Sequence, residues 1–139
     1  MKITPIILSS LLLWASVCTA ETVFITLEKD NAIAVVDPIS GKLIKTVKIG
    51  QRPRGIQLSP DQQTLYIATS DDDTVLEVDA NSLQIKAKLP SGEDPETFAI
   101  NSLGTHMYVS NEDDNQITVI DLLKKQAIHQ VAEIGRAHV

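Results

Sequence analysis

Acidic side chains gather in two short runs of this chain, and they are the first residues whose types could support chemistry. The runs are Asp71-Asp72-Asp73 and Glu112-Asp113-Asp114-Asn115. Clustered carboxylate and amide oxygens suit calcium, but the twelve-residue spacing of a calcium-binding loop is absent. Polar runs between strands are also the ordinary way to form a solvated turn. The sequence therefore predicts turns here and no metal site.

Residues arranged for catalysis are not found. The histidines are His106, His129 and His138, none of them with a recognisable partner, and the single cysteine is Cys18. No serine-nucleophile motif and no Cys-x-x-Cys-His haem-attachment segment occurs. We predict no catalytic residue, no cofactor and no metal in this chain, and a protein that is not an enzyme.

Charge and composition narrow the class of partner. The 12 basic and 18 acidic residues give a net charge of -6, and no basic cluster could neutralise a run of phosphates. Nucleic acid is therefore excluded as a partner. The hydrophobic content of 43% favours a packed core over a disordered chain.

The first 20 residues have the pattern of a secretory signal peptide. A positive end is followed by a short apolar run from Ile6 to Val17 and by small residues up to Ala20. A membrane anchor would need about 20 apolar residues, and a lipoprotein site at Cys18 would follow the bulky Val17; both remain alternatives. We expect cleavage after Ala20, no stable membrane span and an exported mature protein.

Internal repetition organises the rest of the chain. A shift of 42 residues aligns segments 22–63, 64–105 and 106–132 without a gap. Phe24, Tyr66 and Tyr108 share one position of the repeat, for example. Within the middle unit the alternation of apolar residues predicts strands over 55–59, 65–69, 75–79 and 84–89.

Four short antiparallel strands in such a period are typical of a β-propeller blade, with a β-solenoid as the alternative. We therefore predict an all-β chain of about three blades belonging to a larger propeller. The first unit supplies strands over 23–27, 33–37 and 43–49 and lacks the inner strand. The repeat breaks after Ala132, so residues 133–139 are expected to be a non-native tail of a truncated chain, or else a real, divergent terminus.

Most of the recurrent residues have structural roles. Aspartates that end a strand can accept backbone N–H groups of the following turn. Glycine and proline shape the link between successive blades, since glycine permits positive φ and proline fixes φ. The residues concerned are Asp37, Asp79, Asp121, Gly50, Gly92, Pro53 and Pro95.

One face of the predicted propeller collects the charged loops. The turns between the second and third strands and the links between blades emerge on the same side in an antiparallel blade. Because propellers bind through exposed loops, this is the candidate binding face. Its residues are Arg52, Arg54, Asp71, Asp72, Asp73, Glu93, Asp94, Glu96, Glu112, Asp113 and Asp114.

The repeats resemble the YVTN family of β-propellers, with Tyr108-Val109-Ser110-Asn111 and the strand ending at Asp121 as the best match. The stretches EKDNAIAVVD, IGQRPRGIQLSPD, SGEDPETFAI and VSNEDDNQITVID are similar to the propeller proteins associated with pyrroloquinoline-quinone-dependent catabolism. That resemblance covers residues 23–132 and implies a periplasmic protein with seven blades in full, encoded beside quinoprotein alcohol oxidation and transport systems.

Three functions are consistent with these patterns. The first is a non-enzymatic periplasmic protein that binds or scaffolds a protein or small-molecule component of a quinoprotein system. The second is the propeller domain of an enzyme similar to haem-dependent nitrite reductases or lactonases, with its active residues in further blades. The third is a generic surface or adhesion propeller.

Overall fold

The computed structural model describes residues 21–132, so the predicted signal peptide (1–20) and tail (133–139) lie outside the described residues. Strands account for nearly all regular structure, and two single-turn 3-10 helices, η1 and η2, follow β1 and β5. The elements in chain order are β1 Val23–Leu27, η1 Glu28–Asp30, β2 Ala32–Asp37, β3 Lys42–Lys48, β4 Pro53–Leu58, β5 Thr64–Thr69, η2 Ser70–Asp72, β6 Thr74–Asp79, β7 Ile85–Pro90, β8 Pro95–Ile100, β9 His106–Asn111, β10 Gln116–Asp121 and β11 Gln126–Ala132.

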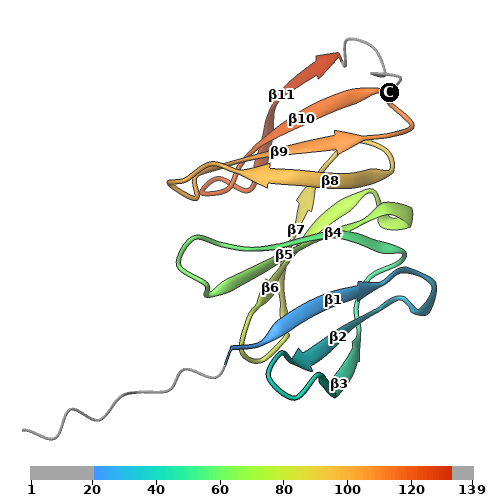
Figure 1. The fold of residues 1–139 in the computed structure, drawn as a ribbon. Helices are drawn as coiled ribbons and strands as arrows, with labels where there is room; N and C mark the ends of the chain where they lie inside the picture. Colours follow the sequence, from blue (N-terminus) through green and yellow to red (C-terminus); the bar gives the residue numbers. More distant parts are fainter. Residues whose placement is uncertain (1–20, 133–139) are drawn as a thin grey trace, which may run out of the picture.

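These strands form three consecutive antiparallel sheets, as Figure 1 shows. The first has the order β1-β2-β3, the second β4-β5-β6-β7 and the third β8-β9-β10-β11. In the second sheet Tyr66 of β5 lies opposite Gln57 of β4 and Glu77 of β6. The all-β class and the antiparallel pairing of neighbouring strands are confirmed. The inner strands β4 and β8 each come from the end of the preceding repeat, so a sheet begins one strand before the repeat unit that supplies its other three strands.

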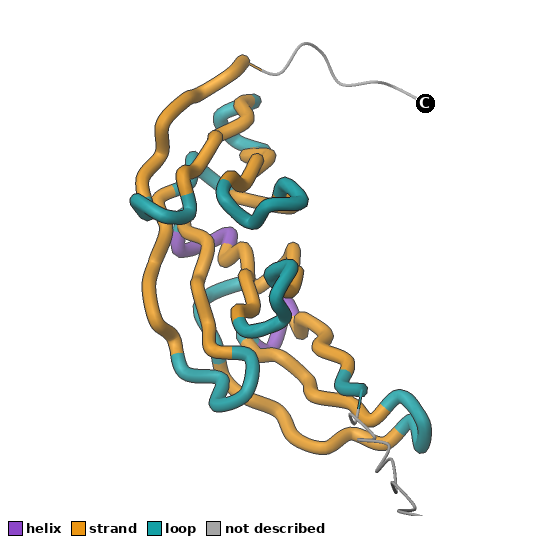
Figure 2. Tube along the Cα trace, turned by 90° about the vertical axis from the view of Figure 1, so that its left-hand side faces the viewer, coloured by secondary structure: helices purple, strands orange, loops and turns teal. Residues whose placement is uncertain are grey.

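The core lies between the sheets. Side chains of a strand point alternately to the two faces, and β5 divides accordingly. Its Leu65 and Ile67 join the cluster shared with the first sheet, whereas Tyr66 and Ala68 join the cluster shared with the third sheet. Figure 2 shows the three sheets following one another along an arc, with the middle sheet packed on both sides.

Some strand boundaries differ from those predicted. The inner strand β4 begins at Pro53 rather than Gly55, and its pairing with β5 shifts register between Pro53 and Ile56. Proline fits here because a strand's first residue, or a bulge, can lack an N–H donor. The outer strand β7 runs from Ile85 to Pro90, one residue later than expected.

The turns repeat in backbone conformation as well as in sequence. Asn31, Asp73 and Asn115 occupy equivalent positions after β1, β5 and β9, and all three have positive φ near 50°. Short polar side chains tolerate this left-handed region better than other non-glycine residues. Among the described residues, no helix is long and apolar enough to cross a membrane.

Candidate functional site

Two side chains fix each link between successive sheets. The N–H of Gln51 donates to Asp72 Oδ2 at 2.6 Å, and the N–H of Arg52 donates to Asn31 Oδ1 at 2.8 Å. One repeat later Asp114 accepts the N–H of Glu93 (2.8 Å) and Asp73 accepts that of Asp94 (3.0 Å). The acidic turns thus satisfy link amides that would otherwise be unpaired.

The glycines of the links are required by close packing. A Cβ at Gly50 would lie 2.3 Å from Thr69 Cγ2, and a Cβ at Gly92 would lie 2.5 Å from Asn111 Nδ2. Gly50 also has a φ of +28°. Asn111 is buried, accepts the Gly92 N–H at 3.1 Å and donates to Thr118 Oγ1 at 2.8 Å. Asn111 therefore holds the second link through a hydrogen bond that the absence of a side chain at Gly92 allows.

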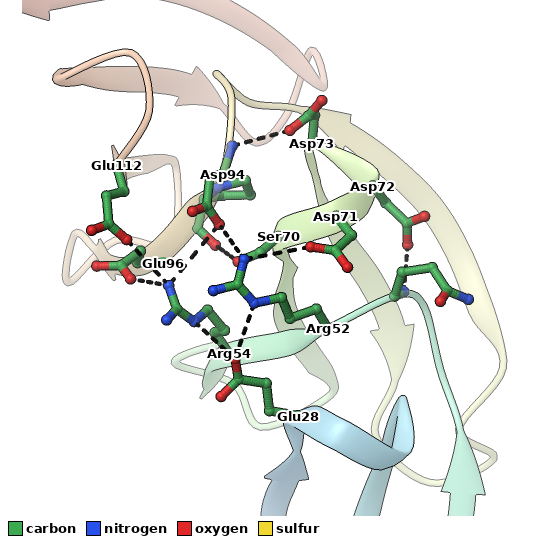
Figure 3. Close-up of polar contacts among 12 residues, drawn as sticks. Glu28, Arg52, Arg54, Ser70, Asp71, Asp72, Asp73, Asp94, Glu96 and Glu112 are labelled. Atoms are coloured by element: carbon green, nitrogen blue, oxygen red, sulfur yellow. Dashed lines mark hydrogen bonds and ion pairs between the residues drawn. The ribbon is translucent and has the colours of Figure 1, made fainter.

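Charged side chains from all three sheets meet beside these links and form what we call the arginine cluster (Figure 3). Arg52 lies at its centre. Its Nε is 3.0 Å from Glu28 Oε1, and its Nη1 is 3.5 Å from both Asp71 Oδ1 and Asp94 Oδ1. The hydrogen bond to Glu28 is the largest cause that raises the Arg52 pKa above its ordinary value. The members of the cluster are Glu28, Arg52, Arg54, Asp71, Asp94, Glu96 and Glu112.

Arg54 connects the second sheet to the first and the third. Its Nη1 forms an ion pair with Glu96 and lies 3.6 Å from Glu112 Oε2 and 4.0 Å from Asp94 Oδ1. Its Nε is 3.7 Å from Glu28 Oε1. Arg54 therefore holds carboxylates of both neighbouring sheets through its Nε and Nη1.

The cluster carries more negative than positive charge. Two guanidinium groups face five carboxylates, and Asp94 Oδ1 is buried without a hydrogen bond among the described residues, held only by its ion pairs with the arginines. Both arginines are thus already paired. The arrangement therefore disfavours a simple anion. It favours a neutral or cationic ligand that accepts a hydrogen bond from Arg54 and donates hydrogen bonds to the carboxylates.

The structure brings together Arg52, Arg54, Asp71, Asp94, Glu96 and Glu112 of the predicted binding face. The link hydrogen bonds instead involve Asp72, Asp73, Glu93 and Asp114. Asp113 is exposed in its turn.

Three polar residues at this face were missed by the sequence analysis. Glu28 could have been found, because it is the repeat equivalent of Glu112. Thr26 donates to the Arg54 carbonyl at 2.9 Å and Ser70 to the Pro95 carbonyl at 2.7 Å. Isolated hydroxyl residues in a strand or turn give no sequence signal for such contacts.

The strand-ending aspartates lie at the opposite end of the sheets. Asp37 accepts the N–H groups of Ile39 and Ser40, and Asp79 accepts those of Asn81 and Ser82. The largest cause that lowers the pKa of the Asp37 carboxyl is the backbone N–H of Ile39. For the Asp79 carboxyl it is the backbone N–H of Ser82, and a hydrogen bond from Lys86 lowers the Asp79 pKa further. In the third sheet Asp121 accepts the backbone N–H of Lys124, and this hydrogen bond is the largest cause that lowers the Asp121 pKa.

The two histidines within the described residues do not join the arginine cluster. His106 Nδ1 lies 2.9 Å from the hydroxyl of its neighbour Thr105, and His129 is exposed on β11. Among residues 21–132 no group of histidine, cysteine and carboxylate side chains is arranged to hold a metal ion.

Consecutive antiparallel sheets with inner strands β4 and β8, linked at one charged face, define a segment of a β-propeller. The sequence profile of the family described as lactonase, seven-bladed beta-propeller, matches residues 21–129. The chain therefore belongs to this family. No curated protein matches the chain in sequence.

Two solved structures share the fold. The hydrazine synthase of Kuenenia stuttgartiensis is 25% identical, with a TM-score of 0.72 over 78% of this chain and 32% of that one. The dihydro-heme d1 dehydrogenase NirN, solved in complex with DHE, is 18% identical, with a TM-score of 0.66 over 81% of this chain and 24% of that one. This chain thus spans a third or less of either relative.

The expectation that the protein is not an enzyme is contradicted by these matches. The family is described as a lactonase, and the relatives are a synthase and a dehydrogenase. The expectation rested on missing local motifs. A propeller assembles its site from loops of several blades, so its chemistry needs no motif within one contiguous segment.

Proposed function

We propose that this chain supplies three blades of an enzyme propeller that acts on lactones, with the arginine cluster as part of the substrate site. The observation that supports this most is the meeting of carboxylates from the first and third sheets around Arg54 of the inner strand β4. Membership in the lactonase family supplies the substrate class.

The chemistry of ring opening fits these groups. Water must attack the lactone carbonyl, whose oxygen gains negative charge, and the ring oxygen must receive a proton. The Arg54 guanidinium donates to the carbonyl oxygen, and a carboxylate such as Glu112 takes the proton from the attacking water and returns it to the ring oxygen as the ring C–O bond breaks. The surplus of carboxylates excludes anions from the site and leaves a neutral ester as the better ligand.

The test measures the hydrolysis of simple aliphatic lactones by the full chain, detected through the acid that is released. In the variant Arg54→Gln we expect kcat to fall about 100-fold, because the variant loses a charged donor to the developing oxyanion. Lys124→Gln is the matched control, since Lys124 pairs with Asp121 at the other end of the sheets. Absence of hydrolysis, or equal loss in both variants, would contradict the proposal.

A second candidate is a tetrapyrrole-binding propeller, favoured by the structural similarity to NirN in its complex with DHE. A titration with haem, followed by absorbance, separates the two candidates. Tight binding that Arg54→Gln weakens, together with no lactone hydrolysis, would support this candidate over the first.

We also propose that the protein is exported and works beside a periplasmic quinoprotein alcohol-oxidation system. The pattern of residues 1–20 and the resemblance of residues 23–132 to quinoprotein-associated propellers support this. Residues 1–30 fused to a reporter that matures only outside the cytoplasm should give activity, and the mature chain should begin at Glu21. Activity confined to a cytoplasmic reporter would rule out export.

A further inference from the structure

Acidic and basic side chains occupy different parts of each repeat. The turn before each outer strand and the outer strand itself contain no aspartate or glutamate, although the whole chain has a net charge of -6. We call these segments, 38–48, 80–90 and 122–132, the outer belt. Its lysines are Lys42, Lys45, Lys48, Lys86, Lys88, Lys124 and Lys125. The outer belt is therefore a basic surface on an acidic protein.

The outer belt lies at the edge of the sheets away from the arginine cluster. Each of β3, β7 and β11 is the last strand of its sheet and, within the described residues, pairs only with β2, β6 or β10. Figure 2 shows these outer strands along the convex side of the arc. The strand β4, which carries Arg54, is the opposite edge of the sheet that ends in β7. A partner on the outer belt would therefore leave the arginine cluster accessible.

Three lysines of the outer belt can meet the charge of a partner. Lys42, Lys45 and Lys88 are exposed and form no ion pair with the other residues of 21–132. The ion pairs of the belt are formed by Lys86, Lys124 and Lys125. Because the acidic residues lie elsewhere in each repeat, the belt can approach an anionic surface with its lysines first.

Apolar side chains are exposed between these lysines. They are Ile39, Leu43, Ile44, Ile85, Leu123, Ile128 and Val131. Ile85 is 47% exposed although its sheet packs on both sides, so its exposure does not result from a place at the end of the arc. Lysine on an edge strand discourages pairing with another chain. Exposed leucine and isoleucine do not serve that purpose, so the belt needs a second explanation.

A hollow connects the first two strands of the belt. It measures about 370 Å³ and lies between the end of β3 and the start of β7. Its lining includes Lys48, Ile49, Gln51 and Ile85. An ammonium group beside apolar side chains suits a lipid, whose headgroup is anionic and whose acyl chains are apolar.

We propose that the outer belt docks the protein on the surface of a membrane that carries anionic phospholipids. The lysines meet the headgroup phosphates, and the exposed apolar side chains reach the boundary of the acyl chains. An acidic protein or polymer would meet the lysines but would leave the apolar side chains without a function. The combination of both kinds of side chain therefore favours a bilayer surface.

Vesicle binding tests this proposal. The full chain is mixed with vesicles of equal parts phosphatidylcholine and phosphatidylglycerol, and the bound fraction is measured by flotation. We expect binding that weakens as salt is added, because salt screens the attraction between exposed lysines and lipid phosphates. Lys42→Gln with Lys45→Gln and Lys88→Gln should weaken binding about 100-fold, since each lysine near an anionic surface contributes about a factor of five.

A matched pair of single variants separates the belt from the net charge. Lys45→Gln and Lys29→Gln remove the same charge, but Lys29 lies in η1, outside the belt. We expect about a fivefold loss of vesicle affinity for Lys45→Gln and no loss for Lys29→Gln. All variants keep residues 1–20, so a difference between them reports the belt alone.

The apolar side chains have a test of their own. Leu43→Ser with Ile44→Ser should lower vesicle affinity about tenfold and leave its salt dependence unchanged. Equal losses for Lys45→Gln and Lys29→Gln would overturn the proposal, as would vesicle binding by the unaltered protein that does not respond to salt. Binding to soluble polyglutamate without binding to vesicles would also overturn it and would indicate an acidic protein as the partner.

Discussion

The middle sheet and the first sheet carry nearly the same repeat, yet the same positions have different surroundings in each. Ile67 of β5 is fully buried, whereas its equivalent Ile25 of β1 is 45% exposed. The third sheet differs in the same way: Tyr66 of the middle sheet is 8% exposed, whereas its equivalent Tyr108 in the third sheet is 46% exposed. The sheets pack face to face, so burial of a repeat position depends on its neighbouring sheet and not on the repeat sequence alone.

The largest expected effect tests this difference directly. Ile67→Ala removes a buried side chain from the cluster between the first two sheets and should lower the free energy of unfolding by about 2–5 kcal/mol. Ile25→Ala makes the same chemical change at a half-exposed position and should cost less than about 1 kcal/mol. Urea denaturation of both variants measures the two values. Equal losses would mean that another surface covers β1 in solution.

A smaller effect is expected at the links. Gly50→Ala places a methyl group against Thr69 and should cost about 3 kcal/mol, the upper range for overpacking. Gly41→Ala is the control, because Gly41 has a φ of +65° with open space around it and should cost only about 1 kcal/mol of backbone strain. Adding Thr69→Ser to Gly50→Ala removes the nearest methyl and should restore part of the stability. No restoration would show that the backbone angle, not the contact, sets the cost.

The sequence predicted the sheets well because a 42-residue period repeats its own strand pattern. Alternation located β5 within a residue, since it depends on which side chains are apolar. It missed the start of β4, where Pro53 and the shift in register interrupt the alternation. Bulges depend on pairing with a partner strand, which a single strand's sequence does not specify.

The candidate site was only partly predictable for a related reason. The repeat placed Arg52 and Arg54 on the same face as Asp94 and Glu96, but it could not show that the arginines are paired by these residues. Whether a charge is free or paired depends on distances between sheets. The prediction of no enzyme is contradicted by the family match, because that prediction relied on motifs within one contiguous segment.

A third test concerns the link hydrogen bonds. Asp73 has positive φ and accepts the N–H of Asp94. Asp73→Ala removes that acceptor and adds strain, so the free energy of unfolding should fall by about 1–2 kcal/mol. Asp73→Asn keeps an amide oxygen and should be nearly neutral, because asparagine occupies the equivalent positions 31 and 115. If both variants lost equal stability, the carboxylate charge rather than the hydrogen bond would be responsible.

The smallest effect is a pH dependence that separates the two ends of the sheets. The pKa of Asp79 lies below its ordinary value of 3.8 because the N–H of Ser82, then Lys86 and the Ser82 hydroxyl, favour the ionised form. A folded-state pKa below the unfolded value means that the carboxylate stabilises the fold above about pH 4, and that this stability is lost as the pH falls through the folded-state pKa. Asp79→Asn cannot titrate, so its stability should change less than that of the unaltered protein below about pH 4.

Asp37→Asn provides the comparison within the chain, because the Asp37 carboxylate is stabilised by the N–H of Ile39 and then by Ser40, with no lysine among the causes of its lowered pKa. Thermal unfolding from about pH 6 to pH 2 measures all three proteins, and added salt should reduce the difference at Asp79 more than at Asp37, since salt screens the ion pair with Lys86. If Asp79→Asn kept the full acid sensitivity, the Asp79 carboxylate would not be its source.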